Sequence, residues 1–193
     1  ASLMQILKKQ RDAVGLSVYS DAYEYYAPEK GSERHHHMLL DTLEKIVAQP
    51  PSAKKTKTFT YLHQIAQKIK RRSLIFLFTD MFQDDEEEER LFEALRHLKY
   101  NKHELTLFHT YDRERELNFD FDNAPKRFID VETGEGVNLY ADTVKANYEE
   151  AVRAYFERLR IKCMQYQINY VPVDIQQSFD QVLTTYLVER RKY

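Results

Sequence analysis

The sequence has little glycine and only one cysteine, and both shortages exclude classes of site. Four of its 193 residues are glycine, and none lies in a G-x-G-x-x-G or a G-x-x-x-x-G-K pattern. Both patterns let the backbone approach a phosphate closely, so we expect neither a dinucleotide site nor a Walker ATPase. Cys163 cannot form an internal disulfide and lies in a predicted helix. It therefore fits a core position in a protein of the reducing cytoplasm.

The chain also lacks long apolar runs and a clear excess of either charge. No run approaches the roughly 18–20 residues that span a bilayer, and residues 1–11 are too short and polar for a secretory signal. We therefore expect no membrane segment. Lys and Arg total 29 against 31 Asp and Glu, a net charge of −2, which argues against a dedicated nucleic-acid binder. A nucleic-acid surface stays the third alternative, on Lys54, Lys55, Lys57, Lys68, Lys70, Arg71 and Arg72.

No residue pattern marks a catalytic nucleophile. A G-x-S-x-G elbow is absent. Three consecutive histidines would point about 100° apart on a helix, so they cannot share one metal ion, and we interpret them as a solvated helix start. These are His35, His36 and His37. The acidic run 84–89 is interpreted as a solvated helix amino terminus. Four scattered histidines are interpreted as surface or half-buried residues rather than ligands: His63, His97, His103 and His109.

What the chain does contain is an alternation of strand-like and helix-like segments. Helices are predicted at 2–11, 34–48, 60–70, 86–99, 144–163 and 179–187. Strands are predicted at 13–19, 74–78, 105–109 and 168–173, with an extended edge at 23–26 and a hairpin at 127–131 and 137–140. This alternation predicts one α/β domain over residues 1–193. We expect a doubly wound, mostly parallel sheet with helices on both faces, a three-layer sandwich.

Asp80 is the most specific candidate site residue. It follows the most apolar predicted strand, 74–78. Ligands of parallel sheets bind beyond the carboxyl ends of the strands, and a carboxylate there suits Mg²⁺. Asp80 could equally cap or order the loop that follows it. The spacing alone does not separate these two interpretations.

Four segments resemble the proteins of the domain of unknown function 58 family. They are residues 11–21 (RDAVGLSVYSD), 72–80 (RSLIFLFTD), 128–135 (FIDVETGE), and residues 168–170 with the closing helix. Their order and spacing cover nearly the whole chain. The resemblance implies a von Willebrand factor A-like, Rossmann-like fold with a metal-ion-dependent adhesion site.

In that fold the metal ligands come from a D-x-S-x-S segment, a threonine of a second loop and an aspartate after the fourth strand. Only Asp80 matches, with Thr79 beside it, so the resemblance implies a degenerate Mg²⁺ site. The loop around Ser32 has no matching threonine, and we expect the D-x-S-x-S segment before Ala1. The family's genes commonly accompany MoxR-type AAA+ ATPases and other von Willebrand A proteins. These are the implied protein partners, in assembly or activation of other complexes.

The expected fold places its first strand between segments 13–19 and 74–78, and no segment of this chain supplies it. Unpaired buried backbone groups cost about 1–3 kcal/mol each. We therefore expect an amino-terminally truncated domain whose missing strand comes from upstream sequence, from another strand or from another molecule.

Two functions from different classes follow. The first is a cytoplasmic, non-enzymatic protein-interaction domain. The second is a Mg²⁺-dependent hydrolase or phosphotransferase that uses Asp80 with Asp84 or Asp112.

Overall fold

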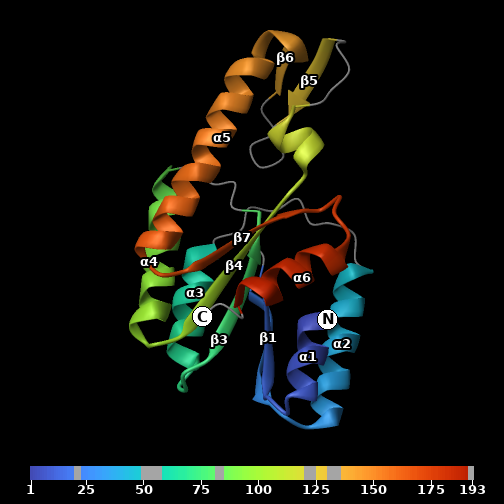
Figure 1. Ribbon diagram of the computed structural model, residues 1–193, viewed down its shortest axis with the longest axis vertical. Coiled ribbons are helices and arrows are strands. Elements are labelled where there is room, and N and C mark those ends of the chain that lie inside the picture. The colour runs from blue at the N-terminus through green and yellow to red at the C-terminus, as the bar shows by residue number, and fades with distance from the viewer. Residues whose placement is uncertain (20–22, 49–57, 81–84, 120–124, 130–135, 191–193) are drawn as a thin grey trace. The chain divides into compact units, whose positions relative to one another are not determined.

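The computed structural model describes residues 1–19, 23–48, 58–80, 85–119, 125–129 and 136–190. The chain divides into two compact units, Ala1–Tyr61 and Leu62–Tyr193, which are described separately. Figure 1 shows the elements in chain order. Among the described residues, no helix combines the length and the apolar character that crossing a bilayer requires.

The first unit is a two-stranded antiparallel sheet with two helices. Strands β1 (Val14–Tyr19) and β2 (Tyr23–Lys30) pair with each other, and α1 (Ser2–Lys9) and α2 (Glu33–Val47) contact β1. The core of this unit consists of Val14, Ala27 and Leu39, with Met4, Leu7, Leu16 and Tyr25 packed against it. The predicted strand at 13–19 is confirmed, and the segment at 23–26 is confirmed as its partner.

The predicted solvated histidine cluster at the start of α2 is wrong for two of its three members. His35 is 6% exposed and His36 is 3% exposed. The ring Nε2 of His35 lies 3.0 Å from the carbonyl oxygen of Val14, so this imidazole ties α2 to β1. Only His37 is exposed. The helical period that separates consecutive side chains by about 100° sends two of them inward.

The second unit contains a parallel three-stranded sheet in the order β3-β4-β7. Its strands are β3 (Leu74–Thr79), β4 (Glu104–Tyr111) and β7 (Asn169–Asp174). The intervening helices are α4 (Asp85–Tyr100) and α5 (Ala141–Gln165), and α3 (Thr58–Lys68) and α6 (Phe179–Arg190) flank them in sequence. The hairpin β5 (Pro125–Ile129) and β6 (Gly136–Tyr140) leads directly into α5, and its predicted turn lies outside the described residues.

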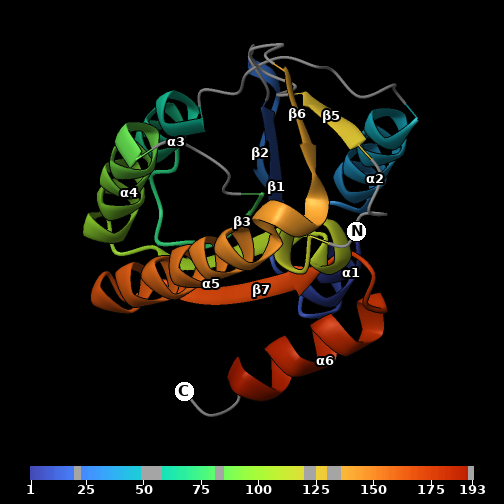
Figure 2. The same ribbon diagram turned by 90° about the horizontal axis from the view of Figure 1, so that it is seen from above.

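Successive side chains of β4 point to opposite faces of the sheet, and a helix covers each face. On one face, His109 and Tyr111 contact Phe156 of α5. On the other face, Phe108 contacts Tyr186 of α6, at 5.4 Å between ring centroids. Figure 2 shows α5 and α6 on opposite sides of β7. The prediction of a parallel sheet with helices on both faces is therefore confirmed for these three strands, because side chains alternate between the faces of a strand.

The core of the second unit lies mainly between α4, α5 and the sheet. Six side chains there are at most 1% exposed: Leu91, Leu95, Leu98, Leu107, Leu159 and Cys163. The predicted core position of the single cysteine is confirmed. Burial, and to a lesser degree the charge of Glu88, raises the pKa of the Cys163 thiol to about 12, so it is not a reactive thiolate.

Candidate functional site

The strongest candidate site is the edge of the parallel sheet where its three strands end, here called the carboxyl rim. β3 ends at Thr79 and is followed by Asp80, β4 is followed by Asp112, and β7 ends at Asp174. Thr79 is level with His109, and Tyr111 is level with Asp174. Since the strands are parallel, all three aspartates lie at the same edge, where ligands of such sheets bind.

Asp112 serves as the cap of a short π-helix, η1 (Arg113–Leu117). Its carboxylate accepts hydrogen bonds from the backbone N–H groups of Glu114, at 3.1 Å, and Arg115, at 3.2 Å. In turn, the carboxylate of Glu116 accepts a hydrogen bond from the backbone N–H of Asp112 at 3.1 Å. This reciprocal arrangement resembles a capping box and orders the segment that follows β4.

Asp174 connects the ends of β4 and β7. The residue is 6% exposed, and its carboxylate lies 3.4 Å from Nε of Arg113 and accepts from the backbone N–H of Gln176 at 3.1 Å. The N–H of Ile175 donates to the carbonyl of Tyr111 at 2.9 Å. The two loops that follow β4 and β7 are therefore held together by one buried carboxylate and one backbone bond.

The electrostatics of the rim are acidic. Burial raises the pKa of Glu116, and the negative charges of Asp112 and Asp80 raise it further, against the lowering effect of its hydrogen bond to the backbone of Asp112. The carboxylate of Asp80 is therefore near enough to Glu116 for the two charges to interact. Glu116 is half-buried and Asp80 is exposed, so the negative charge is accessible to a ligand or partner.

His109 lies in β4 beneath the rim and is fully buried, and His103 is 2% exposed, so the prediction that they are surface or half-buried residues is wrong for both. Its Nδ1 is 2.7 Å from the hydroxyl of Tyr170. Burial lowers the pKa of His109 to about 4, although a hydrogen bond with the backbone of Asp80 acts in the opposite direction. The ring is therefore neutral at ordinary pH. Burial also raises the pKa of Tyr170, so the pair is a neutral hydrogen bond inside the core.

The predicted metal residues, Thr79 and Asp80, lie at the rim, Thr79 half-buried and Asp80 exposed. Within the described ranges no three His, Cys, Asp or Glu residues are grouped so that they could hold a metal ion. Asp84 lies outside those ranges, and the carboxylate of Asp112 already caps η1. A Mg²⁺ site at Thr79 and Asp80 stays a prediction.

The tertiary structure brings together pairs of residues that the sequence kept apart. His63 on α3 and His97 on α4 face each other, with 3.3 Å between their Nδ1 atoms. Glu88, which belongs to the acidic run predicted to be solvated, is only 2% exposed and pairs with Lys162 and Arg158 of α5. The prediction of a fully solvated run is therefore wrong at Glu88. No local pattern indicates which side chains of neighbouring helices meet.

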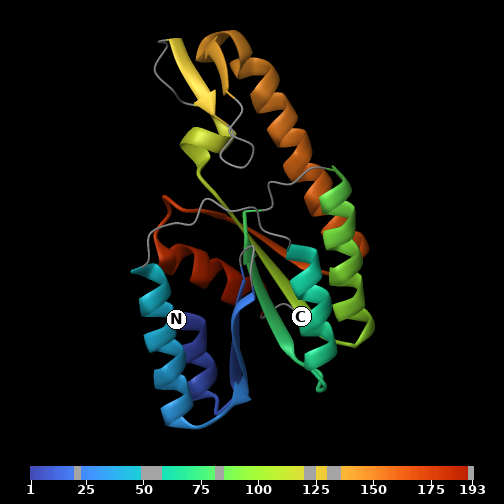
Figure 3. The same ribbon diagram turned by 180° about the vertical axis from the view of Figure 1, so that it is seen from behind.

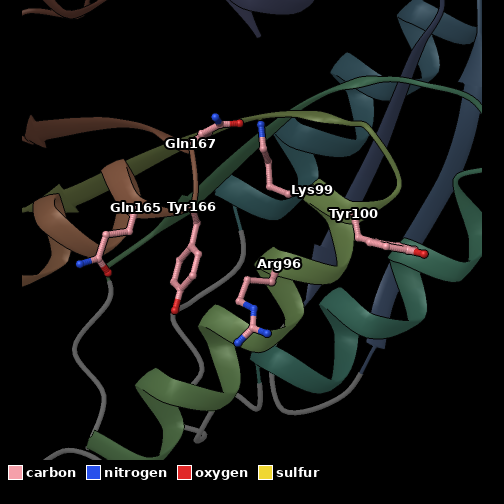
Figure 4. Close-up of a pocket in the computed structure, with 6 residues that line it drawn as sticks. All are labelled: Arg96, Lys99, Tyr100, Gln165, Tyr166 and Gln167. Carbon is pink, nitrogen blue, oxygen red and sulfur yellow. The ribbon is translucent and has the colours of Figure 1, made fainter.

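A shallow pocket of about 340 Å³ lies beside the amino ends of β4 and β7. It is lined by Arg96, Lys99, Tyr100, Gln165, Tyr166 and Gln167. The guanidinium of Arg96 lies over the ring of Tyr166, 5.6 Å from its centroid, and Figure 4 shows both side chains extending in the same direction. This pocket is at the opposite edge of the sheet from the carboxyl rim, and the sequence did not indicate it.

Comparison with known proteins supports one family. The family model described as "Protein of unknown function DUF58" matches residues 1–158. No curated protein and no solved structure gives a significant match.

Proposed function

Because the chain belongs to the DUF58 family, described as a family of unknown function, we propose that it is a non-enzymatic protein-interaction domain with a von Willebrand factor A-like fold. The observation that carries this proposal is the position of β3. This strand, LIFLFT, is the most apolar in the chain, yet it forms one edge of the three-stranded sheet. Continuous apolar strands are typical of sheets that are covered on both faces.

The edge of β3 suits the addition of a strand. All six residues from Leu74 to Thr79 are paired in register with β4 on one side, and none of the described strands pairs with the other side of β3. Strand edges bind extended segments through backbone hydrogen bonds. Phe78 is 56% exposed even though its ring stacks on Phe108, with 4.7 Å between the centroids. An added strand would cover this aromatic surface.

The carboxyl rim adds a second part to the proposed interface. β3 runs directly into Asp80, and the charge of Asp80 acts on Glu116. A partner that adds a strand to β3 would bring its own flanking residues to this acidic edge, and basic residues there would be favoured. We propose a MoxR-type AAA+ ATPase, or another von Willebrand A protein, as the partner. Thr79 and Asp80 would form a degenerate Mg²⁺ site at the interface.

The experiment is a calorimetric titration of the full chain with a MoxR-type AAA+ ATPase from the same organism, with and without Mg²⁺. Phe78→Lys places a charge at the edge of β3 and should weaken binding by roughly tenfold or more, since a charge on an edge strand opposes pairing. Asp80→Asn should weaken it less. Val47→Lys is the matched control, because Val47 is 85% exposed in the other compact unit.

Equal affinity of the wild type, Phe78→Lys and Val47→Lys would reject the β3 edge as the interface. Thermal unfolding of each variant, followed by circular dichroism, shows whether the sheet is intact. Loss of binding in a folded Phe78→Lys protein, with Val47→Lys unaffected, is the supporting result.

The enzyme alternative rests on the acids of the rim. Asp80 and Asp112 follow neighbouring strands, as the carboxylates of magnesium enzymes do. Against it, Asp112 is engaged as the cap of η1 and the ring of His109 is buried away from solvent, so neither is an available base. Turnover of p-nitrophenyl phosphate with Mg²⁺ that is lost in Asp80→Asn would favour the enzyme. We expect no turnover above the blank in either protein.

A further inference from the structure

Two histidines from different helices approach each other on the outside of the second unit. α3 and α4 lie side by side, as Figures 1 and 3 both show. His63 and His97 are half-buried, with 3.3 Å between their Nδ1 atoms, 5.6 Å between their ring centroids and a tilt of 42°. The pair is therefore reachable from solvent and is presented by two regular elements rather than by loops.

The separation of the two nitrogens matches the spacing of two ligands on one metal ion. Zinc binds imidazole nitrogen at about 2.0–2.1 Å with tetrahedral geometry, which places two such nitrogens about 3.3–3.4 Å apart. We propose that His63 and His97 bind one transition-metal ion through their Nδ1 atoms. In the part of the chain that the structure describes, no third His, Cys, Asp or Glu completes a cluster, so water would fill the other positions.

The two helices hold the histidines in place independently of any metal. On α3, the residues next to His63 pack inward: Leu62 is 2% exposed and Ala66 is 2% exposed. On α4, Leu98 beside His97 is fully buried. A side-chain amide donates across the same helix pair, from Asn101 to the carbonyl of Ala66 at 3.4 Å. A site built on packed helices is more precise than one built on loops.

The chemistry of the pair selects the class of metal. Neutral imidazole nitrogen suits Zn²⁺, Cu²⁺ and Ni²⁺, whereas Mg²⁺ prefers oxygen ligands. An Nδ1–Nδ1 hydrogen bond requires one of the two Nδ1 atoms to carry a proton. If both Nδ1 atoms bind a metal ion, that ring takes its other tautomer, with the proton on Nε2. Glu93, exposed one turn before His97 on α4, adds negative charge on the same side of the helix.

The test is a titration of the full, tag-free chain with zinc chloride, followed by calorimetry at neutral pH. The expected result is saturable one-to-one binding that His63→Gln and His97→Gln each weaken by roughly tenfold or more, at least the effect of losing an outer-shell partner. Glutamine keeps a hydrogen-bonding side chain but is a poor zinc ligand. His37→Gln is the matched control, because His37 is an exposed histidine of the other unit, and it should leave this binding unchanged.

A second measurement identifies the ligands directly. With one equivalent of Cu²⁺, electron paramagnetic resonance of the wild type should show coupling to two imidazole nitrogens, and either single variant should lose one of them. Absence of saturable zinc binding would overturn the proposal. So would zinc binding that persists unchanged in both His63→Gln and His97→Gln, because the metal would then be held elsewhere.

Discussion

The Glu88 carboxylate, 2% exposed, lies 2.6 Å from Nζ of Lys162, a contact that joins the start of α4 to α5. Arg158, one turn earlier on α5, approaches the same carboxylate at 3.2 Å. Lys162 also lies over the ring of Phe92, 5.2 Å from its centroid. Glu88, from the acidic run that was predicted to be solvated, is thus neutralised inside the interface between two helices. An unpaired charge there would strongly destabilise the fold.

We expect Lys162→Met to lower the free energy of unfolding by about 1–3 kcal/mol, because the buried Glu88 would lose its nearer cation and keep Arg158 at 3.2 Å. The double variant Glu88→Leu/Lys162→Met should recover most of this loss, since no buried charge remains. Urea unfolding measures both. Arg160→Met is the control: its exposed pair with Glu157 on the same helix is screened by water, so its loss should have little effect. A double variant less stable than Lys162→Met would contradict the interpretation.

The buried His109 should make stability depend on pH. Its pKa is about 4 in the folded protein and about 6.5 in an unfolded chain, so between these values the unfolded state binds more protons. Stability should therefore fall as pH falls from 6.5 to 4. In His109→Gln, the part of the fall in stability between pH 6.5 and 4 that comes from His109 should vanish. The overall stability of this variant should be lower. Urea unfolding at a series of pH values measures the slope.

Glu116 acts in the opposite direction, because its folded pKa is raised. Its contribution to stability is present at low pH and is lost as pH rises through the folded pKa. Glu116 is present in both the wild type and His109→Gln, so its contribution cancels in the difference between their slopes. Identical slopes in the two proteins would mean that His109 is not the buried neutral group that the structure shows.

The cap of η1 can be tested at Asp112. Asp112→Ala removes the acceptor for the N–H groups of Glu114 and Arg115, and should lower stability by about 1 kcal/mol. Asp112→Asn keeps an acceptor oxygen and should restore most of the loss, as measured by thermal unfolding. Asp41→Ala, at an exposed position of α2, serves as the control with little effect. If Asp112→Asn were as unstable as Asp112→Ala, charge rather than capping would be the important property.

Two tyrosines offer a matched test of the core. Tyr186 is 1% exposed and its ring contacts Phe76 and Phe108, whereas Tyr100 is 86% exposed. Tyr186→Ala should lower the free energy of unfolding by about 3–5 kcal/mol, as other large-to-small aromatic truncations do. Tyr100→Ala should change it by less than about 0.5 kcal/mol. Similar losses in both variants would show that α6 does not cover this face of the sheet.

Most of the secondary structure could be predicted from the sequence, because periodicity is a local property. The apolar run 74–78 became β3, and the helical spacing before Cys163 became α5. The π-helix at Arg113–Leu117 was missed, although the pattern of an aspartate followed four residues later by Glu116 was a signal for it. This spacing alone does not predict a helix, because the two carboxylates form the cap only when the backbone brings them to the same turn.

By itself, the sequence determined the order and type of the elements, the core position of Cys163, and the acidic residue at the end of β3, because each depends on neighbours within a few turns of the chain. The tertiary structure decided that β3 is the edge of its sheet, that Glu88 is buried against Lys162, and that His63 meets His97. These relationships join residues 34 and 74 positions apart, or depend on strand pairing. Such contacts arise from packing of whole elements, which no local pattern of side chains specifies.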